Sequence, residues 1–161
     1  MNPFIPNRIV SGGQTGVDRG ALDAALALGI EHGGWCPMNR QSEDGSIPSR
    51  YQLTELAGAD YARRTEQNVI DSDATLVLYE GPLIGGTRLT VRFASIHSRP
   101  CLTQPLGRKF DPDRVRQWLN QLQPDSLNIA GPRESKYPGI GERAFAALLR
   151  IFEQNSKGDV V

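Results

Sequence analysis

Short apolar runs separated by longer amphipathic stretches make up most of this chain. The run ATLVLY at 74–79 is the clearest buried strand, because six residues in a row are apolar or β-branched with no charge among them. Shorter runs of the same kind predict four more strands, at 9–12, 32–35, 100–103 and 126–131.

Apolar residues recur at helical spacing between these runs. Val17, Ala21, Ala25 and Leu28 share one face of a helix expected over 15–28. The same periodicity predicts helices over 62–71 and 86–98, a helix after the cap Asp111-Pro112, and a last helix that ends near Phe152. Strands alternating with helices are typical of an α/β fold. We expect a Rossmann-like doubly wound sheet, mainly parallel, of about five strands with helices on both faces.

One stretch departs from this alternation. Residues 36–60 are mostly polar and contain two prolines, and they predict a long loop with a short helical turn near 51–56. The chain has no repeat and no linker, so we expect 1–161 to be a single Rossmann-like domain. Its ordered core would cover about 7–153, followed by a C-terminal tail at 154–161.

The formal net charge is zero, so no overall field favours nucleic acid or an acidic membrane surface as a partner. No apolar run approaches the roughly 18–20 residues that cross a bilayer, and the N-terminal residues do not resemble a signal peptide. Cys36 and Cys101 match no zinc or redox spacing, and we expect both to be reduced, buried thiols. These features predict a cytoplasmic protein.

Glycine-rich segments follow several predicted strands, at the sheet edge where ligands bind in α/β proteins. Glycines let backbone N–H groups approach a ligand closely, and a helix N-terminus favours a negative charge. Basic side chains lie beside these glycines. The pattern predicts a phosphate site for a small molecule, without a metal ligand set or a catalytic constellation, formed by Gly12, Gly13, Gln14, Thr15, Gly16, Gly85, Gly86, Thr87, Arg88, Arg133, Ser135 and Lys136.

Other polar residues admit two interpretations. Asp18 lies in the first turn of a helix, where an acid suits the helix dipole, although it could also bind a ribose or pterin edge. Arg63 and Arg64 would by default face solvent. Arg64 nevertheless shares a helical face with Thr65 and Asn68, which leaves an inward role open. Among acids near the glycines, Glu80, Glu134 and Asp44 have no support as bases beyond their location.

Five blocks of the sequence resemble the molybdenum cofactor carrier protein family, in order, over about residues 8–150. The blocks are SGGQTGVDRGALDAAL, GGWCPMNRQSEDGSIPSRYQL, RTEQNVIDSDATLVL, GPLIGGTRLT and NIAGPRESKYPGIGERA. A more distant likeness joins the chain to the Rossmann-like group of the cytokinin-activating phosphoribohydrolases and DNA-processing protein A. The glutamate of the phosphoribohydrolase motif has no match after Thr87, which argues against nucleotide hydrolysis.

The resemblance implies a protein that binds and stores or carries the molybdenum cofactor, a pyranopterin with a terminal phosphate, without catalysing a reaction. It also implies a homo-oligomer and molybdoenzymes as recipients of the cofactor. Two alternatives stay open: an enzyme that acts on nucleotide N-glycosidic bonds, and a module that senses a phosphorylated small molecule. No nucleic acid or membrane partner is expected.

Overall fold

The computed structural model describes residues 2–58 and 60–154, and its centre is a parallel sheet of five strands. In spatial order the strands are β2 (Glu31–Gly33), β1 (Arg8–Val10), β9 (Ser126–Ala130), β7 (Ala74–Tyr79) and β8 (Cys101–Pro105). The last of these strands in the sequence, β9, therefore lies in the middle of the sheet, between β1 and β7. The predicted α/β class and parallel sheet are confirmed.

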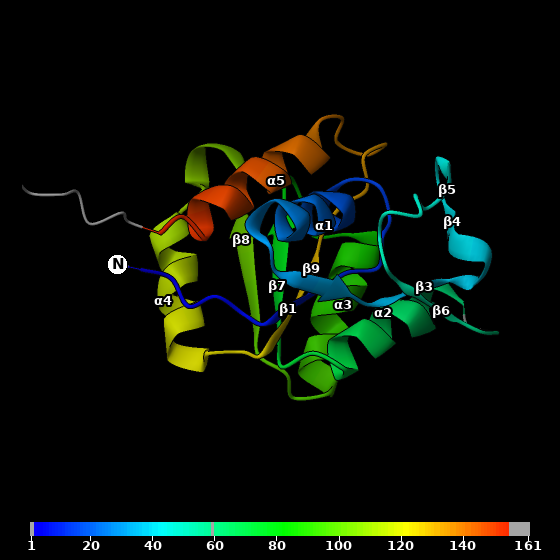
Figure 1. Ribbon diagram of the computed structural model, residues 1–161, viewed down its shortest axis with the longest axis horizontal. Coiled ribbons are helices and arrows are strands. Elements are labelled where there is room, and N and C mark those ends of the chain that lie inside the picture. Colours follow the sequence, from blue (N-terminus) through cyan, green and yellow to red (C-terminus); the bar gives the residue numbers. More distant parts are fainter. Residues whose placement is uncertain (1, 59, 155–161) are drawn as a thin grey trace, which may run out of the picture.

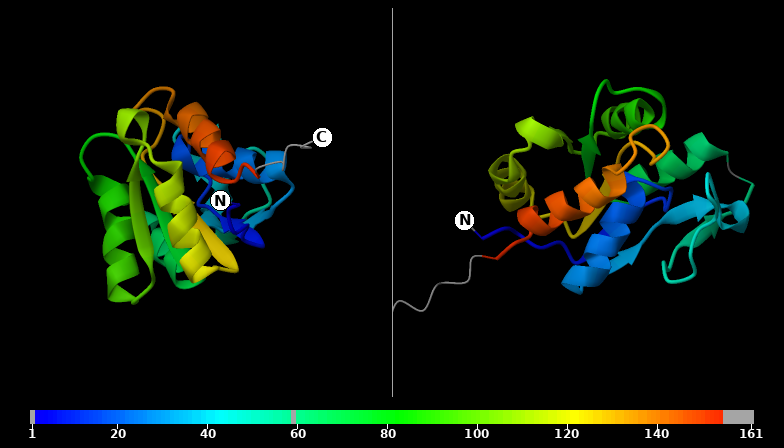
Figure 2. Two further views of the ribbon diagram at one scale, coloured as in Figure 1. Left: turned by 90° about the vertical axis from the view of Figure 1, so that its left-hand side faces the viewer. Right: turned by 90° about the horizontal axis from the view of Figure 1, so that it is seen from above.

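Helices cover both faces of the sheet (Figures 1 and 2). One face carries α1 (Val17–Leu28), α4 (Pro112–Leu122) and α5 (Ile140–Ile151), and α1 and α5 pack against each other. The opposite face carries α2 (Tyr61–Ile70) and α3 (Gly85–Ile96), which also pack together. The expected helices are all present, with ends that differ by a residue or two from the prediction.

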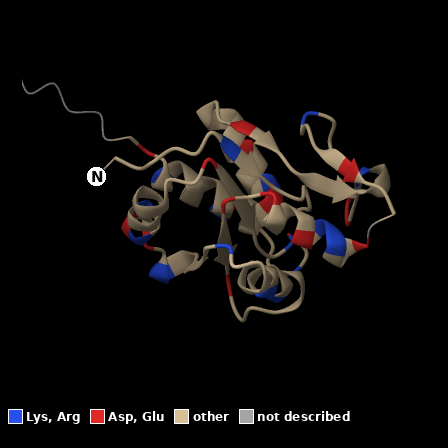
Figure 3. Cartoon of the chain, turned by 90° about the horizontal axis from the view of Figure 1, so that it is seen from below, with Lys and Arg blue, Asp and Glu red and all other residues tan. Residues whose placement is uncertain are grey.

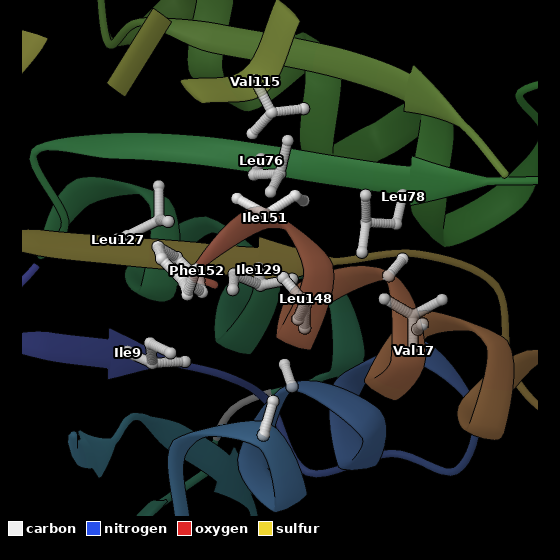
Figure 4. Packing of buried hydrophobic residues seen from close by; sticks show 14 of the residues in the cluster. Ile9, Val17, Leu76, Leu78, Val115, Leu127, Ile129, Leu148, Ile151 and Phe152 are labelled. Carbon is white, nitrogen blue, oxygen red and sulfur yellow. The ribbon is translucent and has the colours of Figure 1, made fainter. Parts of the chain in front are cut away.

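The two faces of the sheet differ in polarity. Successive side chains of a strand point to opposite faces, and Leu76, Leu78, Leu127 and Ile129 all point toward α1 and α5 in an apolar core (Figure 4). The alternate positions include Thr75 and Asn128, which are buried and joined by a hydrogen bond of 3.3 Å from Asn128 Nδ2 to Thr75 Oγ1. Buried polar groups therefore lie on the face that α2 and α3 cover.

The predicted second strand divides in two. The chain leaves the main sheet after Gly33, and β3 (Trp35–Pro37) pairs in parallel with β6 (Thr54–Leu56) in a separate two-stranded sheet. Gly34 between them has a φ of 133° and lies against the backbone of Ser11, where a Cβ atom would overlap the Ser11 carbonyl oxygen. This close approach requires glycine and explains the interruption.

The polar segment is more structured than its sequence suggests. The expected helical turn near 51–56 is wrong, because β6 occupies the end of that range. A 3₁₀ turn (Met38–Arg40) leads into a small hairpin of β4 (Gln41–Ser42) and β5 (Gly45–Ser46). Ile47 and Tyr51 turn inward to form a second, smaller core with Leu22 and Cys36. A second 3₁₀ turn (Gly107–Lys109) follows β8.

The remaining expectations have mixed outcomes. Cys36 is buried as predicted, whereas Cys101 is half-buried, and both are free thiols. Within residues 2–58 and 60–154, no helix is long and apolar enough to cross a bilayer. Residues 155–161 of the predicted C-terminal tail lie outside the described part of the chain.

Candidate functional site

A polar cleft opens at the carboxyl ends of β1 and β9, on the side of the sheet that α2 and α3 cover. Its floor comes from the ends of the two strands, and its walls come from α2, the start of α3 and the loop that follows β9. The lining residues are Gly12, Gln14, Asp18, Tyr61, Arg64, Thr65, Asn68, Gly86, Thr87, Thr90, Asn128, Ala130, Gly131, Pro132, Arg133 and Lys136.

Arg64 of α2 is the main charged group of this cleft. It is only 5% exposed, and its guanidinium stacks on the Tyr61 ring at 4.3 Å from the ring centre. Its nearest carboxylate is Asp18, with 3.7 Å between Arg64 Nη1 and Asp18 Oδ2. The buried Nε has no hydrogen-bond partner among the described residues. A guanidinium carries five N–H donors, so Arg64 has donors to spare for a ligand.

Gly12 lies directly against this guanidinium. A Cβ atom at residue 12 would overlap Arg64 Nη1 and approach Asp18 Oδ2 to 3.1 Å. The glycine therefore leaves the space that the Arg64 head group occupies at the end of β1. A glycine expected to cradle phosphate through its backbone thus also makes room for an arginine.

Asp18 is the acid inside the cleft. It is 6% exposed, and burial raises its pKa to about 6, although the nearby Arg64 charge and a hydrogen bond from the Gln14 N–H lower it in part. The distance from Gln14 N to Asp18 Oδ2 is 3.2 Å. The carboxyl group therefore changes charge near neutral pH, beside a cation.

The backbone of the first glycine-rich loop is largely engaged within the protein. The amide of Gly13 donates to Ser11 Oγ, that of Gln14 to Asp18, and that of Thr15 to its neighbour's side-chain oxygen. The amide of Val17, the first residue of α1, donates to the Pro132 carbonyl at 3.1 Å. Few N–H groups of this loop are left for a ligand.

The start of α3 provides donors that the first loop does not. The first amides of a helix have no intrahelical acceptor, and no side chain caps α3 at Ile84. Gly86 and Thr87 both line the cleft there, and Lys136 and Arg133 reach it from the loop after β9. This end of the cleft thus combines open amides, a helix dipole and two cations, a combination that favours an anion.

The structure brings together only part of the predicted site. Gly12, Gln14, Gly86, Thr87, Arg133 and Lys136 line the cleft. The other predicted residues do not line it: these are Gly13, Thr15, Gly16, Gly85, Arg88 and Ser135. Arg88 is exposed, and the hydroxyl groups of Thr15 and Ser135 donate to Glu43. Sequence reasoning placed no weight on Tyr61, Thr90 or Asn128.

The three acids considered as possible bases have structural partners instead. Glu134 accepts hydrogen bonds from the amides of Gly139 and Gly141 at the start of α5. Glu80 pairs with Arg143 through both carboxylate oxygens. Asp44 pairs with Arg19, and this hydrogen bond holds the pKa of Asp44 below its usual range.

Charge outside the cleft is evenly mixed. Figure 3 shows basic and acidic residues spread over most of the elements. Over the described ranges, no three His, Cys, Asp or Glu side chains come together in a way that could hold a metal ion. The cleft is therefore suited to recognising an anionic group through arginine, lysine and backbone amides.

A family model that matches this chain spans all the residues of the cleft. A family model described as the circularly permutated YpsA SLOG family matches residues 9–152. The chain is also similar to a crystal structure named as a putative molybdenum carrier protein from Syntrophus aciditrophicus SB, with 43% sequence identity and a TM-score of 0.87. That match covers 94% of this chain and 97% of the other. No match was found among curated proteins.

Proposed function

This chain belongs to the circularly permutated YpsA SLOG family, and from that premise we propose that its cleft binds a phosphorylated small molecule, the molybdenum cofactor. The observation that carries the proposal is Arg64, a buried guanidinium with unused N–H donors, which lies beside the cleft's acid and lines the cleft together with the start of α3. Leaving a buried charged donor unpaired is costly, and an anionic ligand would remove that cost.

The terminal phosphate of the cofactor would lie between Arg64 and the first amides of α3. Gly86 leaves the approach to these amides open, because its position bears no side chain. Lys136, which lies beside Gly85, and Arg133, which lies over the Tyr61 ring, add positive charge to the same space. Arginine binds phosphate through paired N–H donors, whereas lysine acts as a point charge, so Arg64 would set the orientation of the phosphate.

The flat pterin would lie next to the phosphate, at the outer edge of the same cleft. Tyr61 is 38% exposed and lies at the edge of the cleft, with Gly86 close by. Asn128 donates to Thr75 and keeps its amide oxygen as an acceptor. An aromatic ring and a neutral hydrogen-bonding side chain suit a flat heterocycle with N–H donors. The molybdenum would be held by the cofactor's own sulfur atoms, since the cleft supplies no ligand set for a metal.

The proposed role is storage and transfer of the intact cofactor. A carrier needs groups that recognise its cargo and none that react with it. Glu80, Glu134 and Asp44 are all engaged in structural contacts, which favours binding without turnover. The expected homo-oligomer, the cytoplasmic location and the recipient molybdoenzymes stay predictions.

Asp18 supports one alternative. A carboxyl group with a pKa near 6 inside a cleft is suited to proton transfer at neutral pH. An enzyme acting on nucleotide N-glycosidic bonds would use such a group. Incubation with nucleoside monophosphates would then release free base in wild type and not in Asp18→Asn, whereas a carrier would release none in either.

The direct test uses cofactor released from a denatured molybdoenzyme. The protein is incubated with this material, reisolated by gel filtration, and measured for molybdenum and oxidised pterin, and then mixed with apo-molybdoenzyme to follow recovery of activity. We expect wild type to retain and transfer the cofactor and Arg64→Met to retain far less. Arg63→Met is the matched control, because Arg63 is the exposed neighbour on the same helix. Equal retention by both variants would refute the assignment of Arg64.

A further inference from the structure

The carboxylate of Glu43 lies in a set of donors that belongs to two of the loops around the cleft. The Thr15 hydroxyl donates to Glu43 Oε1, and so does the Ser135 amide at 3.1 Å. The Ser135 hydroxyl donates to Oε2 at 2.7 Å, and Arg133 Nη1 lies 3.9 Å from the same oxygen. A backbone amide, two hydroxyls and a guanidinium around one carboxylate are also what a protein offers to a phosphate. We call these donors from Thr15, Arg133 and Ser135 the carboxylate nest.

The carboxylate nest adjoins the cleft. Arg133 belongs to both, since it lines the cleft and faces Glu43. Gln14 also lines the cleft, and its Oε1 accepts hydrogen bonds from the amides of Thr15 (3.0 Å) and Glu43 (3.1 Å). An anion in the nest and an anion beside Arg64 would therefore lie on either side of Gln14 and Arg133.

The hairpin that carries Glu43 is held mainly by polar contacts. Residues 41–46 are all exposed or half-buried, and the apolar core of this region begins only at Ile47. Besides Glu43, the main tie is Asp44, which pairs with Arg19 through both oxygens. Little apolar surface would be exposed if Glu43 left the nest, so another anion can exchange with it at low cost.

Glu43 is also ionised under all neutral conditions. Partial burial raises its pKa, but the hydrogen bonds from Ser135 and Thr15 outweigh this and hold the pKa below its usual value. Its side chain is 19% exposed. The nest is thus filled by a permanent, solvent-accessible negative charge that belongs to the chain itself.

We propose that the carboxylate nest is a second anion subsite, that Glu43 occupies it in the absence of ligand, and that a ligand with two anionic groups displaces Glu43. This inference rests on the proposed function, in which the cleft already binds one phosphate beside Arg64. The ligand class it defines is a small molecule with a phosphate at one end and a second anionic group within reach of Arg133. A molybdenum cofactor, with its phosphate and its oxo-dithiolene centre, has that character.

The test removes the internal anion and asks whether an added anion replaces it. Glu43→Ala leaves the nest empty, whereas Glu55→Ala removes an equal charge from an exposed position in β6 of the same segment. Inorganic phosphate and diphosphate are titrated against each variant while the melting temperature is followed. We expect Glu43→Ala to be stabilised at about tenfold lower phosphate concentrations than wild type or Glu55→Ala. Adding Ser135→Ala to Glu43→Ala should abolish this gain.

Two outcomes would overturn the proposal. In one, Glu43→Ala gains no more from phosphate than Glu55→Ala does. In the other, Glu43→Ala binds diphosphate more weakly than wild type, which would make Glu43 a strap that holds the loops together. The Arg64→Met variant allows the carboxylate nest to be tested independently of the phosphate site proposed beside Arg64. With Arg64→Met and Glu43→Ala combined, the nest should still bind one phosphate, even if the cleft's own site proves not to exist.

Discussion

Replacing Arg64 with methionine should weaken ligand binding strongly while leaving the fold nearly as stable as before. Methionine has a similar length and fits an apolar surrounding, and Arg64 is buried against the Tyr61 ring. In the ligand-free protein the guanidinium has a buried Nε without a partner, at a cost of about 1–3 kcal/mol. The substitution removes that cost, which offsets the loss of stacking and of the loose ion pair with Asp18.

The effect on binding follows from the hydrogen bonds that a phosphate would lose. Charge-assisted hydrogen bonds contribute about 1.5–3 kcal/mol, which corresponds to a ten- to hundred-fold loss of affinity. Lys136 and the α3 amides would remain, so binding should be weakened and not abolished. The dissociation constant of the cofactor, or of inorganic phosphate as a simpler probe, measures this loss.

The pH of the stability measurement matters, because Arg64 offsets the charge of Asp18. Below the Asp18 pKa of about 6 the acid is neutral and needs no counter-charge. At pH 5 we therefore expect the free energy of unfolding of Arg64→Met to lie within about 1 kcal/mol of wild type. Above pH 6 the variant should lose stability relative to wild type. A loss of more than about 3 kcal/mol at pH 5 with unchanged ligand affinity would show that Arg64 is a structural residue.

Three further predictions concern single residues of the cleft and its surroundings. Gly86→Ala should keep or raise thermal stability, because its methyl group would lie 3.6 Å from the Tyr61 ring and alanine favours helix. The same methyl group should lower phosphate affinity several-fold, because it crowds the α3 amides. The folded-state pKa of Asp18 is raised, so wild type should lose stability relative to Asp18→Asn as pH rises from 4 to 7, by up to about 3 kcal/mol in denaturant titrations; parallel profiles would contradict this. Glu134→Gln should cost about 1 kcal/mol through weaker capping of Gly141, with ligand affinity unchanged in calorimetry.

The sequence predicts the main sheet well because its strands are apolar on at least one face. The run at 74–79 is buried along nearly its whole length and pairs on both sides. The second predicted strand was only partly right, since HGGW contains the glycine at which the chain leaves the sheet. No local pattern distinguishes a glycine that ends a strand from one that merely interrupts it.

The candidate site was predicted less completely than the fold, because it depends on contacts between elements that are distant in the sequence. The glycines pointed to the edge of the sheet where the cleft opens, but the side chain that carries the proposal comes from the interior of α2. Arg64, Thr65 and Asn68 share one face of that helix, and all three are buried. The spacing was visible, yet a polar helical face is far more often solvated. Only the packing of α2 beside the ends of β1 and β9 shows that this one faces inward.

The position of β9 has a consequence for synthesis on the ribosome. Until residues 126–130 emerge, no strand connects β1 to β7. Each of these two strands then has one backbone edge unpaired. The loop that follows β9 supplies Arg133 and Lys136 to the cleft. A nascent chain therefore cannot assemble the cleft until its central strand is in place, and any ligand of the cleft can bind only after that step.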